Sequence, residues 1–132
     1  MPDIEAESRC KEGYTTTSAI GEHELTIDAT EQNGPSPNQV LVADYASCFI
    51  PAFRVGANKE GFEDVGVIEI DASADLDEED DLEYIEFEMR VEESLGNSVQ
   101  DVVDRAEDIC HVHAAIREEL QAEITVRDDA NL

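Results

Sequence analysis

The feature that most constrains the fold is the long apolar stretch at residues 37–59, which carries few charges in an otherwise acidic chain. Ser36 stands before the stretch, Pro37 opens it, and Gln39 follows Ser36 by three positions. This arrangement is typical of a helix N-terminus closed by a capping box. The sequence therefore predicts one long helix over residues 37–59, with the thiol of Cys48 in its apolar part.

Two segments alternate with the period of a strand. In residues 23–29, Leu25 and Ile27 lie on one face and Asp28 on the other, and we expect this segment to pair with the one before it through a turn near Gly21. The second alternating segment, residues 85–92, is predicted to be a half-buried antiparallel strand. Its expected inward residues are Ile85, Phe87, Met89 and Val91.

The remaining segments complete an α+β pattern on an antiparallel sheet. Residues 62–71 predict a strand with a bulge at Gly66, and residues 71–81 predict a charged hairpin loop. Residues 96–120 predict a second long helix, and residues 122–128 a last strand. A chain of 132 residues is expected to form one domain over its whole length, 1–132. The apolar stripe of the second helix comprises Val99, Val103, Ala106, Cys110 and Ala114.

Helices of this length predict an oligomer. More than twenty residues at 1.5 Å each span about 30 Å, which is long for so small a sheet. Their apolar stripes would remain partly uncovered in a monomer. We therefore expect a homodimer that buries them.

The charge of the chain excludes several partners. There are 34 Asp and Glu against 8 Lys and Arg, so the net charge is −26, and the carboxylates are spread along the chain. Such a charge opposes compaction, and the repulsion shrinks when the Debye length falls to about 3 Å at molar salt. The composition favours a salt-rich cytoplasm and disfavours nucleic acid and anionic membranes as partners.

Compartment and cysteine usage agree with this interpretation. No basic region followed by an apolar run opens the chain, which disfavours secretion and indicates a cytoplasmic protein. The three cysteines Cys10, Cys48 and Cys110 are odd in number and widely spaced, unlike a secreted disulfide framework. A single free cysteine is more often a small buried hydrophobe than a reactive group, so each thiol needs further context.

Two metal sites can be considered, and neither is predicted. The acidic loop places Asp75, Asp77 and Glu79 at spacings similar to a calcium loop, but Asp80 stands where that loop needs glycine. Cys48, Cys110 and His113 are a conceivable soft-metal set, yet they are only three ligands and match no zinc spacing. His113 alternatively tunes a thiol, or is simply packed.

The flanks of two cysteines resemble a known family. "GPSPNQVLVADYASCF" around Cys48 resembles the first cysteine motif of the OsmC/Ohr family, in which a Gly-Pro-rich loop opens the helix. "AEDICHVHAAIREEL" is similar to the second motif: Ala106, Cys110 and Val112 match, and His111 replaces the usual proline. The N-terminal hairpin and the order of elements extend the resemblance over nearly the whole chain.

The resemblance implies thiol-dependent reduction of organic hydroperoxides by an intertwined dimer with sites at the subunit interface. By this carry-over Cys48 is the peroxidatic cysteine and Cys110 the resolving one. Sulfenic acid forms first and then condenses to a disulfide, which an external thiol or dithiol reduces. No bound cofactor is implied. The alternative is a non-enzymatic stress or binding protein of the same fold, whose cysteine pair is merely redox-sensitive.

The residue that activates Cys48 is not evident. The start of its helix lies about 18 Å away at 1.5 Å per residue, too far for the helix dipole, and Arg54 projects about 240° around the helix. Arg9, Lys11 or a histidine remain as cations, and His113 is predicted on the helical face of Cys110.

The chain also departs from the peroxidase pattern. Members of the family with peroxidase activity have a glutamate at the start of the cysteine helix, where this chain has the amides Asn38 and Gln39. Arg9 lies near the family's expected arginine. Tyr45, one turn before Cys48, is expected to line the apolar wall of a pocket rather than to donate a proton.

Overall fold

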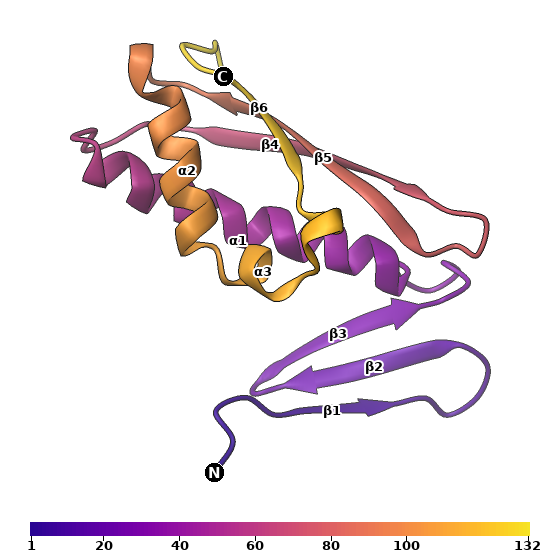
Figure 1. The fold of residues 1–132 in the computed structure, drawn as a ribbon. Coiled ribbons are helices and arrows are strands. Elements are labelled where there is room, and N and C mark those ends of the chain that lie inside the picture. Colours follow the sequence, from indigo (N-terminus) through magenta and orange to yellow (C-terminus); the bar gives the residue numbers. More distant parts are fainter. The chain divides into compact units, whose positions relative to one another are not determined.

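The computed structural model describes all residues, 1–132. Contacts divide the chain into two units, residues 1–41 and 42–132, which are described in turn. Figure 1 labels the helices and strands along the chain. They are β1 (Ala6–Arg9), β2 (Thr15–Ile20), β3 (His23–Asp28), α1 (Pro37–Lys59), β4 (Ile68–Leu76), β5 (Leu82–Val91), α2 (Val99–Ile109), α3 (His111–Ala115) and β6 (Glu123–Arg127), with short 3-10 turns at Gly96–Ser98 and Glu118–Leu120.

The N-terminal unit is a three-stranded antiparallel sheet in the order β1-β2-β3. The predicted hairpin is confirmed, because β2 pairs with β3 and Ile20 faces His23 across the turn. Gly21 adopts φ +59 there, a left-handed conformation that a side chain would strain. Strand β1 adds a third strand that alternation had not indicated.

Asp28 departs from the predicted faces of β3. Leu25, on the expected apolar face, is exposed, whereas Asp28 is buried. The carboxylate accepts hydrogen bonds from the Thr30 hydroxyl at 2.6 Å and from the Thr15 hydroxyl at 2.8 Å, and from the main-chain N–H of Thr30 and Asn33. These bonds, led by that from Thr30, hold the pKa of Asp28 well below its usual range. The buried position at the end of β3 is therefore occupied by a carboxylate, and its hydrogen bonds close the following loop.

The start of α1 forms as predicted. The Ser36 main-chain N–H donates to Gln39 Oε1 at 2.8 Å, and the Gln39 N–H donates to Ser36 Oγ at 3.2 Å. This reciprocal pair is the capping box, and the helix runs over Pro37–Lys59 as expected.

The second unit contains a three-stranded sheet in the order β4-β5-β6. Strands β4 and β5 are antiparallel, whereas β5 and β6 are parallel, with Phe87 facing Ile124. The parallel pair differs from the antiparallel sheet expected from the sequence. Its cause is the connection: the chain leaves β5, passes through α2 and α3, and returns to the same end of the sheet, as a crossover requires.

Strand β4 lies further along the chain than predicted. It begins at Ile68 and continues through residues 71–76, which were expected to form the hairpin loop. Pairing with β5 extends to Leu76, so register with the neighbouring strand outweighs the acidic composition of this segment. Gly66 precedes the strand at φ +74. The turn that remains is closed by Asp77 Oδ1, which accepts the N–H of Glu79 and Asp81.

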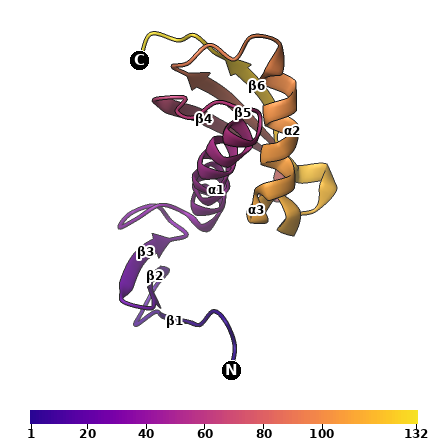
Figure 2. The ribbon, with the colours of Figure 1, turned by 90° about the vertical axis from the view of Figure 1, so that its left-hand side faces the viewer.

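The core of this unit lies between one face of the sheet and two helices. Helices α1 and α2 pack against the same face (Figures 1 and 2), and the alternation predicted for β5 is confirmed. The Phe87 ring lies 4.7 Å from that of Tyr45 and 5.7 Å from that of Phe49, measured between centroids. Gly56 lets α1 approach α2 closely, since an added Cβ would stand 3.1 Å from the Val102 carbonyl oxygen.

The second helix is shorter than predicted, because it breaks at Cys110. Helix α2 ends at Ile109, Cys110 has extended geometry (φ −67, ψ 114), and α3 begins at His111. The Cys110 main-chain N–H still bonds the Ala106 carbonyl, while its sulfur accepts the N–H of His113. Cys110 therefore ends one helix and caps the next. The predicted stripe is buried at Val103, Ala106 and Cys110, but the break leaves Ala114 exposed.

Helix α1 is long and apolar enough, by length and composition alone, to cross a membrane. A core helix of a soluble protein meets the same criterion, and α1 packs its buried aromatic residues against the sheet.

Candidate functional site

Two thiols meet inside the second unit. Cys48 lies on α1 and is half-buried, while Cys110 lies at the junction of α2 and α3 and is 1% exposed. Both are free thiols, and they lie close enough that Cys48 affects the ionisation of Cys110. The packing of α1 on α2 brings together two cysteines that are far apart in sequence.

The environment of Cys110 opposes its ionisation. Burial is the main cause and raises the pKa of the Cys110 thiol to about 11. The His113 main-chain N–H, 3.4 Å from the sulfur, acts in the opposite direction because it favours the anion. Interaction with the neighbouring Cys48 side chain raises the pKa of Cys110 further. Cys110 therefore rests as a thiol.

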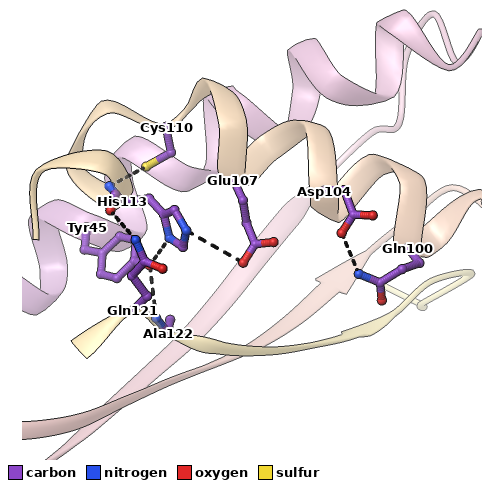
Figure 3. Close-up of polar contacts among 8 residues, drawn as sticks. All are labelled: Tyr45, Gln100, Asp104, Glu107, Cys110, His113, Gln121 and Ala122. Atoms are coloured by element: carbon purple, nitrogen blue, oxygen red, sulfur yellow. Dashed lines mark hydrogen bonds and ion pairs between the residues drawn. The ribbon is translucent and has the colours of Figure 1, made fainter. Parts of the chain in front are cut away.

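His113 lies next to this pair and is held at several points. The residue is 8% exposed, and its ring places Nδ1 2.5 Å from the Tyr45 hydroxyl and Nε2 3.8 Å from Glu107 Oε2 (Figure 3). Its main-chain carbonyl accepts a bond of 3.1 Å from Gln121 Nε2. The main-chain N–H of His113, and not its ring, contacts the Cys110 sulfur, because the predicted continuous helix breaks at Cys110.

Tyr45 is in the core and not on the wall of a pocket. It is fully buried, and burial raises the pKa of its phenol to about 12, so it stays protonated. Its oxygen accepts the main-chain N–H of Ala122 at 3.0 Å. The hydroxyl hydrogen is then free to donate to His113 Nδ1, which places the proton of Nε2 on the side that faces Glu107.

Glu107, whose side chain is 33% exposed, completes this cluster. Burial raises the pKa of its carboxyl, and the neighbouring carboxylates of Asp104 and Asp108 add to this, whereas His113 lowers it. The cluster thus runs from a carboxylate through an imidazole to a phenol, beside the two thiols. Figure 3 shows that α1, α2, α3 and the segment before β6 all contribute to it.

The other predicted site residues belong to the N-terminal unit. Arg9 is exposed at the end of β1 and lines a surface hollow with Lys11 and Tyr14. Gln39 is engaged in the capping box, and Asn38 lies in the first turn of α1. An approach of Arg9, Asn38 or Gln39 to the thiols stays a prediction.

Comparison with family models decides the classification. The model described as OsmC-like protein matches residues 29–125, which include both thiols of the pair. The chain belongs to the OsmC-like family. An uncharacterized protein of Haloferax volcanii is 53% identical to this OsmC-like chain over 131 residues, covering 98% of this chain and 99% of the relative. This similarity supports a haloarchaeal origin.

Solved structures show the OsmC-like fold. An OsmC-like protein of Mycoplasma pneumoniae matches with a TM-score of 0.80 at 14% identity, covering 96% of each chain. The organic hydroperoxide resistance protein OhrB of Bacillus subtilis matches with a TM-score of 0.70 at 22% identity, covering 94% of this chain and 97% of that one. An organic hydroperoxide resistance protein OsmC of Legionella pneumophila gives 0.69 at 21% identity, with coverages of 96% and 97%.

Sequence reasoning missed three members of this OsmC-like site: Glu107, Gln121 and Ala122. On a continuous helix, Glu107 and His113 would project about 240° apart, so no helical pattern pairs them. The break at Cys110 brings them together. His111, at the position where the family motif has proline, gave no indication of the break. Ala122 could not be identified because it acts only through its main chain.

Proposed function

We propose that this protein is a thiol peroxidase that reduces organic hydroperoxides through a Cys48–Cys110 disulfide cycle. The observation that carries the proposal is the close approach of the half-buried Cys48 thiol to the buried Cys110 thiol, whose ionisation Cys48 influences. Each thiol lies in one of the two cysteine motifs by which the chain resembles its family. The names of the OhrB and Legionella relatives support organic hydroperoxides as the substrate class.

The cycle has three balanced steps. The Cys48 thiolate attacks one peroxide oxygen, the O–O bond breaks, and the alkoxide leaves and takes up a proton, so that Cys48 becomes a sulfenic acid. The Cys110 thiolate then attacks the oxidised sulfur, the S–O bond breaks, and hydroxide leaves as water after protonation. An external thiol or dithiol reduces the resulting disulfide.

The two thiols are coupled in a way that suits this order. Negative charge on Cys48 disfavours ionisation of Cys110. Conversion of Cys48 to a neutral sulfenic acid removes that charge, so the pKa of Cys110 falls when its thiolate is required. In the resting protein the same interaction disfavours ionisation of both sulfurs at once.

Turnover kinetics test the proposal. The reduced protein, an excess of dithiol and either an alkyl hydroperoxide or hydrogen peroxide are mixed, and loss of peroxide is followed. We expect catalytic consumption of the alkyl hydroperoxide, faster than that of hydrogen peroxide and much faster than with free cysteine at the same thiol concentration. A rate equal to that of free cysteine would rule out peroxidase activity.

The alternative is a redox-sensitive binding or stress protein of the same fold. Asn38 and Gln39, amides where the peroxidases have an acid, favour it, because an amide cannot pair with a cation as a charge. The same experiment separates the two functions. The alternative predicts that the Cys48–Cys110 disulfide forms slowly and that no peroxide turnover follows.

A cytoplasmic homodimer is part of the proposal. In the N-terminal unit Asp28 is the only buried residue, so that sheet has no apolar core of its own. In the most apolar 18 residues of α1, only 33% are buried, and Val55 is 43% exposed. A second copy would cover such surfaces.

Stability should rise with salt. Because the net charge is −26, raising KCl from about 0.1 M to about 3 M screens the repulsion between carboxylates and should raise the melting temperature. Glu78→Lys with Glu79→Lys, in the exposed β4–β5 turn, should reduce the salt dependence. A melting temperature that does not rise with KCl would contradict adaptation to a salt-rich cytoplasm.

A further inference from the structure

His113 is the most heavily anchored polar residue near the thiols, and the cycle above gives it no task. Its ring, its carbonyl and its N–H each have a partner: Tyr45 and Glu107 on the ring, Gln121 on the carbonyl, and the Cys110 sulfur on the N–H. Only the last of these contacts reaches a reacting atom. The other three fix where that N–H points.

We propose that His113 is the positioning residue of the resolving thiol, with Tyr45 and Glu107 holding its ring so that its main-chain N–H stays on the Cys110 sulfur. This inference rests on the proposed function and deepens it. It assigns a role in disulfide closure to a tyrosine, a histidine and a glutamate that come from α1, α3 and α2.

The need for such a device follows from the burial of Cys110. In this environment the thiolate is disfavoured, yet the thiolate is the form that attacks the sulfenic acid. A hydrogen bond to the anion offsets part of that cost, provided the donor is already in place. A loosely held donor would leave the buried sulfur to bear the full cost of burial.

The ring of His113 is well suited to hold the turn rigidly. The Tyr45 side chain cannot move away without losing the contacts of its oxygen with both His113 Nδ1 and the Ala122 N–H. The charged and titratable groups around the ring are Glu107 from α2, with Asp104 and Asp108 beside it, Tyr45 and Cys48 from α1, and Cys110 itself. Gln121 and Ala122 contribute neutral contacts from the segment before β6.

The test separates the two chemical steps in a Cys10→Ser background. Reduced protein is mixed with one equivalent of an alkyl hydroperoxide and quenched over time with a sulfenic-acid trap and a thiol-blocking reagent. Mass spectrometry then gives the rate of Cys48 oxidation and the rate of disulfide closure. The variants are Tyr45→Phe, Glu107→Gln, His113→Leu and His113→Asn, the last of which keeps an acceptor near the position of Nδ1.

We expect Tyr45→Phe and His113→Leu to oxidise Cys48 at the wild-type rate and to close the disulfide more slowly. Below the pKa of Cys110, each unit by which that pKa rises lowers the thiolate fraction about tenfold, and the greater nucleophilicity of the more basic thiolate offsets only part of this loss. The pH profile of closure should therefore move to higher pH, which general loosening of the site would not cause. His113→Asn should recover part of the closure rate that His113→Leu loses. Glu107→Gln should close the disulfide at a rate between those of His113→Leu and the wild type.

Tyr84→Phe is the matched control. It also removes a tyrosine hydroxyl with two hydrogen-bond partners, Glu86 and Glu123, in the same unit. Its closure rate and pH profile should be those of the wild type. Closure in Tyr45→Phe with an unchanged rate and pH profile would overturn the positioning role, even if Cys48 oxidises rapidly.

Failure of the peroxidase proposal gives a different result. In that case Cys48 oxidation by peroxide is slow in every variant, including the wild type. Closure is then driven with diamide, which forms an adduct on one thiol that the second thiol displaces, releasing the hydrazine. The same order of closure rates still supports the role of His113, and equal rates overturn it.

Discussion

Cys48→Ser should abolish peroxide turnover, whereas Cys110→Ser should stop the cycle after its first step. Without Cys48 the remaining thiol of the pair is 1% exposed, with its pKa raised to about 11, so it cannot replace the lost nucleophile. Without Cys110, Cys48 still reacts with peroxide but has no partner thiol. Stopped-flow peroxide consumption and trapping of sulfenic acid measure the two outcomes.

Cys10→Ser is the control for these variants. Cys10 is exposed in the N-terminal unit, where its thiol donates to the Glu12 and Gly13 carbonyl oxygens, and it should not affect turnover. Rapid peroxide consumption by Cys48→Ser would contradict the assignment of the nucleophile. A stable sulfenic acid that is absent from Cys110→Ser but present in the wild type would contradict the order of the steps.

Phe87→Ala should destabilise the protein by about 3–5 kcal/mol, the usual cost of removing a fully buried phenylalanine. Phe87 is fully buried on the central strand, and its ring packs against those of Tyr45 and Phe49. Its loss leaves a cavity between sheet and α1, directly under the tyrosine that contacts His113. Urea unfolding followed by circular dichroism measures the free energy.

Val67→Ala is the control for that change. Val67 also loses apolar atoms to alanine, but it is largely exposed just before β4, so the effect should stay within about 0.5 kcal/mol. A similar loss of stability in both variants would show that Phe87 is not at the centre of the core. The phenylalanine variant should also slow disulfide closure, because Tyr45 loses the ring that holds it.

Local patterns predicted much of the fold because they report local physics. The capping box of Ser36 and Gln39 fixed the start of α1, and the alternation of Ile85 to Val91 fixed the inward face of β5. The end of β4 was missed because pairing with β5, not composition, decides where that strand stops. The parallel placement of β6 depends on a crossover that no single segment encodes.

The candidate site was predicted in part. Cys48, Cys110 and His113 were identified from their motifs and spacing, and the structure brings them together. Tyr45 was identified but assigned to a pocket wall, since its position on an apolar helix does not indicate a partner on α3. Glu107 was missed, because the helix break at Cys110 changes which residues share a face. Polar contacts made by main-chain groups, such as that of Ala122, leave no trace in side-chain patterns.

Peptide mapping after partial oxidation tests the central claim most directly. The reduced protein is treated with less than one equivalent of an alkyl hydroperoxide, alkylated and digested without reduction. The account predicts a single cross-linked peptide pair joining Cys48 to Cys110 within one chain, with Cys10 alkylated. Oxidation spread evenly over the three cysteines, or cross-links that involve Cys10, would contradict it.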